Sequence, residues 1–237
     1  MSDDSKKVPT KSTRQDVSNF LEKLQSAPVA KNAASQARLI FAMDATASRA
    51  PTWDKASRIQ AEMFLETAKI GKLNIQLCYY GGFYEFHATP WFDHAEPLIR
   101  EMTKVMCQSG NTQIERVLRH AIDETRRDKV RALVLVGDCV EEDPLKLEHF
   151  AGQLALLGVP VFLFQEGHDP VAEATFRAIA RITSGAYSRF DSQSAPQLRE
   201  LLLAVAMYAV GGKSALQDFS KEQHQLADSL VKQLPSK

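Results

Sequence analysis

The chain has few cysteines, and their arrangement is not that of a cross-linked or zinc-binding protein. Cys78, Cys107 and Cys139 are an odd number and include no Cys-x-x-Cys pair. A disulfide framework or a structural zinc site normally needs an even set or closely spaced pairs. We therefore expect three reduced thiols and a cytoplasmic protein.

The chain also has no excess of charge of either sign. It contains 29 Lys plus Arg and 29 Asp plus Glu, so it has no general attraction for nucleic acid or anionic membranes. Residues 1–31 are mostly polar and lack the pattern of a signal peptide. The uncharged stretch Leu201 to Gly212 is too short to span a bilayer. We expect no nucleic-acid partner and no membrane partner.

Glycine-rich phosphate-binding motifs are missing as well. The segment that follows the apolar run Leu39 to Met43 reads Asp-Ala-Thr-Ala-Ser-Arg and contains neither G-x-G-x-x-G nor a P-loop. Nucleotide binding is therefore not predicted. The chain shows no internal repeat and no low-complexity run.

What the chain does have is the composition of an ordinary globular domain. Its 237 residues are 44% hydrophobic and 24% charged, enough for one full core. We expect a disordered N-terminal tail at 1–12, a helix and linker at 13–34, and one domain at 35–212. Residues 213–237 are polar and are expected to form a helical or flexible tail.

Apolar runs and amphipathic segments alternate along the domain. Strands are predicted at 39–43, 74–80, 83–87, 133–136, 159–165 and 186–190, and helices at 13–26, 51–70, 93–106, 111–127, 144–157, 170–182 and 195–210. Gly81 and Gly82 indicate a two-residue hairpin turn. The pattern predicts an α/β fold, a doubly wound and mostly parallel six-stranded sheet flanked by helices. Right-handed crossovers give the order 3-2-1-4-5-6, with one antiparallel edge strand.

The first and fourth predicted strands both end at an aspartate. Asp44 follows Leu39 to Met43, and Asp138 follows the run Ala132 to Gly137. In the predicted order these strands are neighbours at the topological switch point, where ligands of doubly wound sheets bind. The strand pattern and the carboxylates therefore indicate the same location.

Hydroxyl groups accompany these carboxylates. In an extended turn, side chains at positions i, i+2 and i+4 point the same way, and Gly110 allows a tight turn before a threonine. The predicted ligands are Asp44, Thr46, Ser48, Thr112 and Asp138. All offer oxygen, which suits Mg²⁺ or Mn²⁺. Two carboxylates and neutral hydroxyls leave the ion partly positive, so an open position would attract an acidic group from outside.

At these residues the chain resembles the von Willebrand factor A domain. The metal-ion-dependent adhesion site of that family has the pattern Asp-x-Ser-x-Ser, a distant Thr and a distant Asp. Here Asp44-Ala-Thr46-Ala-Ser48, Thr112 and Asp138 match it, with Thr46 replacing a serine. Cys139 stands where a glycine usually follows the last aspartate. The resemblance covers about residues 35–212.

The resemblance implies a particular kind of function. It implies a Mg²⁺-dependent protein-binding module of the intracellular bacterial type, whose partner supplies an acidic residue. Such modules often act beside an ATPase, a chaperone or a stress-response component. No enzymatic activity is expected.

Other interpretations of the same residues remain open. Asp44 and Asp138 would also suit helix caps, and the acidic run Glu141 to Asp143 suits a solvated loop or a capping segment better than extra ligands. Trp91, Phe92 and His94 suit either a contact surface or partial burial. Cys139 suits a buried, inert thiol better than a redox-sensitive one.

An enzyme is the rival class of protein. A Mg²⁺-dependent phosphohydrolase could use the aspartates at the strand ends, but it would need a second nearby acid and a phosphate-binding lysine, and the sequence shows no such set. A cysteine hydrolase would need Cys, His and an acid brought together in the fold.

Overall fold

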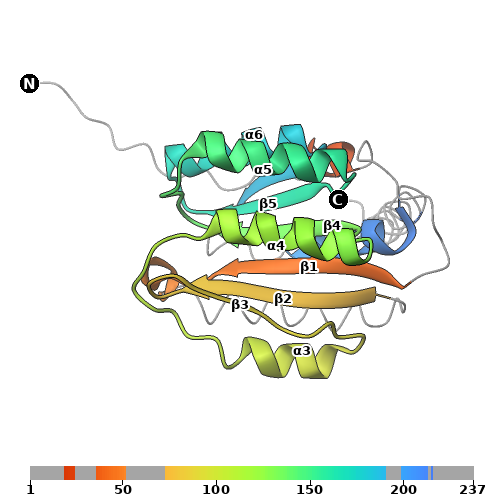
Figure 1. The fold of residues 1–237 in the computed structure, drawn as a ribbon, viewed down its shortest axis with the longest axis horizontal. Helices are drawn as coiled ribbons and strands as arrows, with labels where there is room; N and C mark the ends of the chain where they lie inside the picture. Colours follow the sequence, from red (N-terminus) through yellow and green to blue (C-terminus); the bar gives the residue numbers. More distant parts are fainter. Residues whose placement is uncertain (1–18, 25–35, 52–72, 191–198, 213–214, 216–237) are drawn as a thin grey trace, which may run out of the picture.

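The computed structural model describes residues 19–24, 36–51, 73–190, 199–212 and 215, and its centre is a six-stranded sheet (Figure 1). The strands are β1 (Ala37–Asp44), β2 (Leu73–Gly81), β3 (Glu85–Ala88), β4 (Ala132–Gly137), β5 (Val161–Glu166) and β6 (Ala186–Phe190). Their order is β3-β2-β1-β4-β5-β6. Only β3 pairs antiparallel. The predicted fold class and strand order are confirmed.

The central strand β1 is buried along its whole length. Leu39, Phe41 and Met43 enter one hydrophobic cluster, while Ile40 and Ala42 enter the cluster on the opposite face. Alternate side chains of a strand point to opposite faces. A strand covered on both faces must therefore be apolar at every position, which explains the unbroken run in the sequence.

Helices cover both faces of the sheet (Figure 1). One face carries α4 (Ile114–Arg127), α5 (Pro144–Leu156) and α6 (Pro170–Ile182). The other carries α3 (Ala95–Met102) and the helical residues 19–24 and 199–212. The Phe20 ring packs at a tilt against Phe162 and Phe164 of β5, so the described part of the predicted N-terminal helix belongs to the core. In the described part of the chain, no helix has the length and apolarity needed to cross a membrane.

Three predicted boundaries are wrong in ways that matter for the site. The helix predicted at 111–127 begins at Ile114, and the helix predicted at 93–106 ends at Met102. Residues 103–113 therefore form a connecting segment that includes Thr112. The hairpin turn extends to Tyr84, because Gly81 pairs with Glu85. The helix predicted at 51–70, the tail at 1–12 and most of the tail at 213–237 lie outside the described residues.

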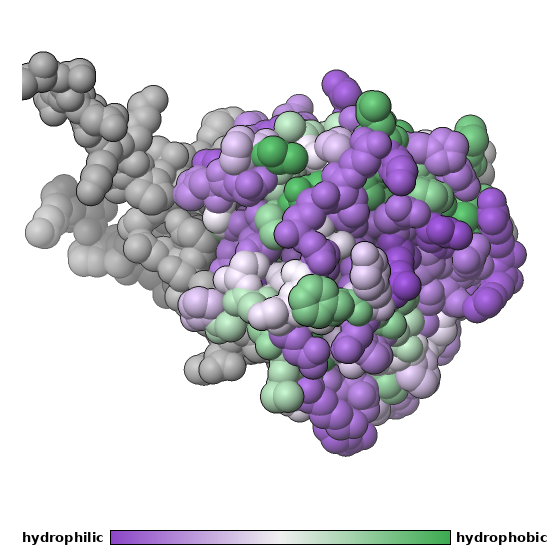
Figure 2. All heavy atoms as spheres, turned by 60° about the vertical axis from the view of Figure 1, so that its left-hand side comes forward, coloured by the Kyte–Doolittle hydropathy of each residue, from purple (hydrophilic) through white to green (hydrophobic). Residues whose placement is uncertain are grey.

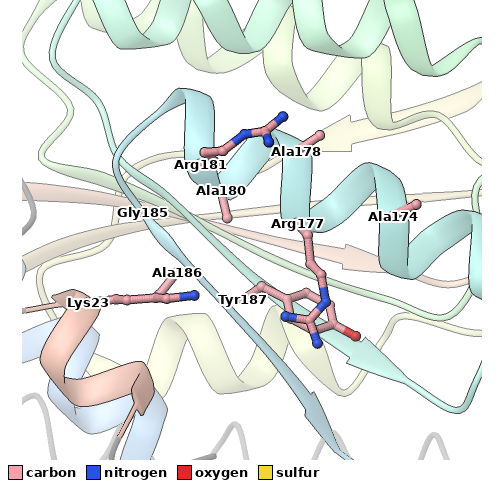
Figure 3. A pocket seen from close by; sticks show the side chains of 9 residues that line it. All are labelled: Lys23, Ala174, Arg177, Ala178, Ala180, Arg181, Gly185, Ala186 and Tyr187. Carbon is pink, nitrogen blue, oxygen red and sulfur yellow. The ribbon is translucent and has the colours of Figure 1, made fainter.

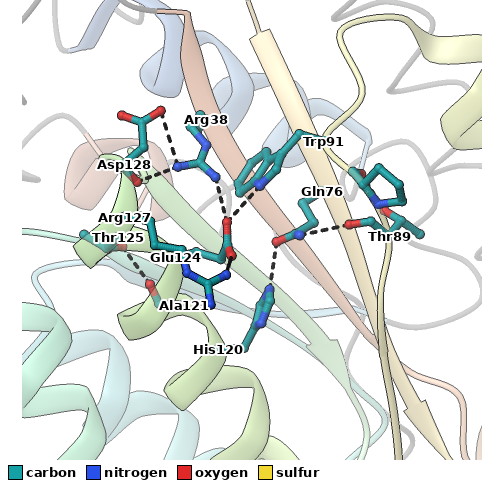
Figure 4. Close-up of polar contacts among 11 residues, drawn as sticks. Arg38, Gln76, Thr89, Trp91, His120, Ala121, Glu124, Thr125, Arg127 and Asp128 are labelled. Carbon is teal, nitrogen blue, oxygen red and sulfur yellow. Dashed lines mark hydrogen bonds and ion pairs between the residues drawn. The ribbon is translucent and has the colours of Figure 1, made fainter.

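A buried polar network closes the end of the sheet where the parallel strands begin (Figure 4). The Arg38 guanidinium donates to Glu124 at 2.7 Å and lies 3.9 Å from the centre of the Trp91 ring. The Trp91 indole N–H donates to the same Glu124 carboxylate at 2.9 Å. Trp91 is half-buried here, and Phe92 bonds to Ile75 and packs against the core. For these two residues, partial burial is the interpretation that the structure confirms.

Candidate metal site at the carboxyl edge of the sheet

The carboxyl edge of the sheet is the edge where β1, β2, β4 and β5 end. At this edge Asp44 is fully buried. Its Oδ1 accepts the backbone N–H of Thr46 at 2.8 Å, and its Oδ2 accepts the Tyr80 hydroxyl at 3.2 Å. Burial raises the pKa of Asp44 to about 6; the bonds from Thr46 oppose this shift, and Asp138 adds to it. An ionised Asp44 is therefore destabilised in the absence of a cation.

Asp138 completes a close pair of carboxylates. Oxygen atoms of Asp44 and Asp138 and the sulfur of Cys139 lie within 4.8 Å of one another. The Oδ1 atom of Asp138 is buried and has no hydrogen-bond partner within the described ranges. Buried carboxylate oxygens are normally bonded or paired with a cation. An orphaned oxygen beside a second buried carboxylate fits a cation bound between them.

Cys139 was not among the predicted ligands, although its sulfur lies within reach. Burial, Asp138 and Asp44 all raise the pKa of its thiol, so it stays protonated. A protonated thiol is a poor ligand for a hard cation, and oxygen ligands favour Mg²⁺ or Mn²⁺. The oxygen atoms therefore remain the better ligand set.

The two hydroxyls of the first motif lie together. The Thr46 Oγ1 and Ser48 Oγ atoms are 3.0 Å apart, and Ser48 belongs to the single 3₁₀ turn η1 (Ala47–Arg49). Thr46 is buried, whereas Ser48 is exposed. The structure thus joins Asp44 to Thr46 and Thr46 to Ser48.

Thr112 reaches this region through the segment that follows Asp138. Its hydroxyl donates to Glu142 at 2.5 Å and accepts the backbone N–H of Glu141 at 3.0 Å. Within the described part of the chain no hydrogen bond links it directly to Asp44 or Asp138. A hydroxyl oxygen has two lone pairs, so one remains for a cation. Donation to a carboxylate also makes the Thr112 oxygen a better ligand.

The acidic run after Asp138 binds the Thr112 segment. The Glu141 carboxylate accepts the Thr112 N–H at 2.8 Å, and the Glu142 carboxylate accepts the Glu115 N–H in the first turn of α4 at 3.2 Å. Asp143 caps α5 by accepting from Leu145 at 3.0 Å. The capping interpretation is thus confirmed for Asp143. For Glu142 the capped helix is α4, a contact that the sequence did not indicate.

The position of this segment depends on Gly110. The backbone N–H of Gln108 donates to Ala45 at 2.9 Å, and Gln108 forms an isolated bridge with Thr46. Two residues further on, a Cβ atom at Gly110 would lie 1.7 Å from the carbonyl oxygen of Gly82. Only a residue without a side chain permits this contact between the loop and the hairpin.

Replacement of this glycine has a predictable result. Gly110→Ala should force the two backbones apart, lower the free energy of unfolding by about 1–3 kcal/mol and weaken any metal-induced rise in melting temperature. The matched control is Gly152→Ala in α5, where an added Cβ meets nothing within 4 Å. That change should stabilise the helix by about 0.5–1 kcal/mol. Equal melting temperatures for the two variants would contradict the assigned contact.

Arg49 is a charged residue beside the candidate site that the sequence interpretation missed. Its guanidinium is buried, donates to the Asp44 carbonyl oxygen at 2.8 Å and pairs with Glu166 at 3.1 Å. It therefore joins the end of β1 to the end of β5 and partly balances the acids between them. Its place directly after the Asp-x-Thr-x-Ser motif was the available indication.

A pocket of about 430 Å³ lies away from Asp44 and Asp138 (Figure 3). Its lining comes from the described helical residues 19–24, from residues 174–181 of α6 and from the start of β6, on the side of the sheet opposite the carboxyl edge. Three side chains are basic, those of Lys23, Arg177 and Arg181. Arg177 lies over the Tyr187 ring at 4.3 Å. The lining has no carboxylate, so this pocket is not a second cation site.

The fold is that of the von Willebrand factor A domain, as comparison with solved structures shows. A von Willebrand factor type A protein from Catenulispora acidiphila superposes with a TM-score of 0.56 at 15% identity, covering 75% of this chain and 43% of the other. The SpRpn10 VWA domain gives 0.55 at 12% identity, covering 72% and 95%. The ArnB paralog VWA2 from Sulfolobus acidocaldarius gives 0.51 at 11% identity, covering 75% and 47%.

Comparison by sequence adds no further assignment. No family model matches the chain, and no curated protein matches it. The chain spans less than half the length of the Catenulispora acidiphila protein. At these identities the structural likeness defines the fold, and the function has to be argued from the site.

Proposed function

We propose that the chain is a Mg²⁺-dependent protein-interaction module of the cytoplasm. Asp44, Thr46, Ser48, Thr112 and Asp138 would hold Mg²⁺ or Mn²⁺, and the ion would take an acidic side chain of a partner protein as a further ligand. The observation that carries this proposal is the unpartnered Oδ1 atom of Asp138 beside the buried Asp44. The fold shared with interaction domains supports it.

The proposed ligands differ in charge. Asp44 and Asp138 provide the negative charge that holds the ion, while the hydroxyls of Thr46, Ser48 and Thr112 contribute neutral oxygens. When bound, the ion supplies an electrophilic position that an outside carboxylate can coordinate. Without the ion, the same carboxylates repel an acidic partner. Binding should therefore depend strictly on the metal.

The contacts favour binding over hydrolysis. In the described ranges, the basic group in contact with the site is Arg49, which bonds to the Asp44 carbonyl oxygen and to Glu166. No lysine bonds to Asp44 or Asp138 there. A phosphohydrolase needs a free cationic group for the transferred phosphate. The alternative, a metal-dependent hydrolase, predicts turnover of a generic phosphatase substrate with Mg²⁺.

Partner capture tests the proposal. Wild-type protein should retain a partner from native lysate in Mg²⁺ and lose it in excess chelator. Thr112→Ala, which removes one ligand oxygen, should retain about tenfold less, a factor equal to 1.4 kcal/mol. ATPases, chaperones and stress-response proteins are the proposed partner classes. Capture that is equal in all three conditions would place the partner elsewhere and overturn the proposal.

A further inference from the structure

Exposed hydrophobic side chains gather at the carboxyl edge of the sheet. Six large hydrophobic residues of the described chain are exposed, namely Phe83, Tyr84, Met106, Leu145, Val171 and Leu156. The first five lie in the hairpin turn after β2, in the segment before α4, or in the first turns of α5 and α6. Each of these places adjoins the edge that carries Asp44 and Asp138. Leu156 alone lies at the opposite end, in the last turn of α5.

The largest of these side chains belong to the tip of the hairpin. Phe83 and Tyr84 are 73% and 77% exposed, and adjacent exposed rings are more informative than a single exposed apolar residue. Tyr84 also has a φ of 62°, a left-handed conformation that costs a non-glycine residue about 1 kcal/mol or more. The fold keeps an exposed tyrosine in a position that would suit glycine or asparagine better.

The hairpin tip is held in place against the Thr112 segment. Arg116 in the first turn of α4 donates to the Tyr84 carbonyl oxygen at 2.8 Å, and Gln113 donates to the Glu85 carbonyl oxygen at 3.1 Å. The backbone of Gly82 lies against Gly110. The backbone of the hairpin tip is therefore held in place relative to the Thr112 segment, which reduces the backbone entropy lost when a partner binds.

Met106 belongs to the same region. It is 73% exposed and lies two residues before Gln108, whose backbone bonds to Ala45 and bridges Thr46. Methionine adapts to irregular apolar surfaces. Met106 thus belongs to the segment that contacts both the hairpin tip, through Gln108 and Gly110, and the first metal motif at Thr46.

Charge near the tip favours an acidic occupant. Arg116 is exposed, and its hydrogen bonds in the described structure go to neutral oxygens of Tyr84 and Gln113. Its charge therefore remains available to a carboxylate. Glu85 is the acid of the hairpin itself and lies 4.0 Å from His87. Figure 2, turned towards the side to which β1 and β2 point in Figure 1, shows hydrophobic residues spaced among hydrophilic ones. On this face the apolar residues therefore do not merge into one large continuous patch.

We propose that Phe83, Tyr84 and Met106 form the specificity surface of the metal site, and that its partner presents an Asp or Glu flanked by bulky apolar residues. The inference rests on the proposed function, because the acidic residue is the one that the ion binds. The apolar neighbours of that acid contact the hairpin tip and Met106, and Arg116 adds attraction for further acidic residues.

A displayed peptide library tests the inference. The library has a central Asp or Glu between randomised positions and is selected on immobilised full-length protein, once in Mg²⁺ and once in chelator. Wild type should enrich aromatic and large aliphatic residues beside the acid, only in Mg²⁺. A selected peptide should bind about tenfold more tightly than the same peptide with serines in the flanking positions, a factor equal to 1.4 kcal/mol.

Two variants separate the hypothesis of a specificity surface from that of the metal site. Phe83→Ser combined with Tyr84→Asn removes the rings and keeps the left-handed turn, since asparagine tolerates that conformation. It should lose the flanking preference and the tenfold gain, and keep the same Mg²⁺-induced shift in melting temperature. The control Leu156→Ser removes an exposed apolar side chain at the opposite edge and should behave as wild type.

Each outcome of the selection decides one of the hypotheses. Acid-dependent enrichment in Mg²⁺ without apolar flanks, or with flanks unchanged in the hairpin variant, would overturn the specificity surface and leave the metal function standing. Enrichment of apolar peptides without an acid, or equally in chelator, would mean an ordinary hydrophobic contact. Absence of any Mg²⁺-dependent enrichment by wild type would overturn the proposed function itself.

Discussion

Magnesium should raise the melting temperature of the wild-type protein and leave that of Asp44→Asn unchanged. A ligand that binds only the folded state at a hundred times its dissociation constant adds about 2.7 kcal/mol to the free energy of unfolding. For a domain of this size that corresponds to a shift of roughly 5 to 10 °C. A thermal melt with titrated Mg²⁺ measures it directly.

Without metal, the order of stability of the wild-type protein and Asp44→Asn should be reversed. Asp44 is fully buried. Burial and the charge of Asp138 raise its pKa, and the hydrogen bonds from Thr46 only partly oppose this rise. Asparagine keeps the size of the side chain and an oxygen that accepts from Thr46, and it removes the buried charge. Asp44→Asn should therefore be more stable than wild type in chelator, by about 1–3 kcal/mol.

This reversal of order distinguishes a metal ligand from a structural aspartate. The control is Asp143→Asn, which changes an acid of the same region whose structural contact is the cap of α5. It should shift with Mg²⁺ as wild type does. An Asp44→Asn protein that is unfolded in chelator, or that shifts with Mg²⁺ as much as wild type, would show that Asp44 is structural.

The second large effect is expected in the buried network of Arg38, Trp91 and Glu124, at the end of the sheet where the parallel strands begin. Glu124→Leu should lower the free energy of unfolding by about 3–5 kcal/mol, because it removes the buried carboxylate that pairs with the Arg38 guanidinium and leaves the exposed carboxylate of Asp128 as its remaining acidic partner. The side chains of Arg38 and Glu124 are 10% and 7% exposed. The additional change Arg38→Met should restore most of the loss, since it removes the uncompensated charge. Urea unfolding of the two single variants and the double variant measures the coupling.

An exposed pair on the same helix is the control for this measurement. Asp123 and Arg126 are 62–63% exposed and 3.7 Å apart, and Asp123→Asn should change stability by less than about 0.5 kcal/mol. The pKa of Glu124 is lowered, because the bonds from Trp91 and Arg38 outweigh the effect of burial. Its contribution is therefore complete above the ordinary value of 4.5 and is lost as the pH falls through the folded value. A loss of stability equal to that of the control would contradict the role of the network.

The parts of the fold that follow from local sequence could be predicted. The unbroken apolar runs before Asp44 and Asp138 indicate central strands because both faces of those strands are covered. The crossover rule then places the two aspartates side by side. The pairing of β1 with β4 confirms this placement.

The rest depends on contacts between distant segments. α4 begins at Ile114 because Glu141 and Glu142, nearly thirty positions away, bind the residues before it. The hairpin turn includes Phe83 and Tyr84, and its first residue, Gly82, lies against Gly110. The bond of Arg49 to Glu166 spans 117 positions. No periodicity or local motif contains these long-range contacts, which appear only in three dimensions.

One helix connects the two polar regions of the molecule. α4 begins where Glu142 holds Glu115, and its last turns carry Glu124, which holds Arg38 and Trp91. Its 14 residues span about 21 Å at 1.5 Å per residue, and a helix resists compression along its axis. A displacement of the Thr112 segment along the axis of α4 would therefore move the whole helix. The indole of Trp91 contacts the far end of this helix, on the opposite side of the sheet from the candidate metal site.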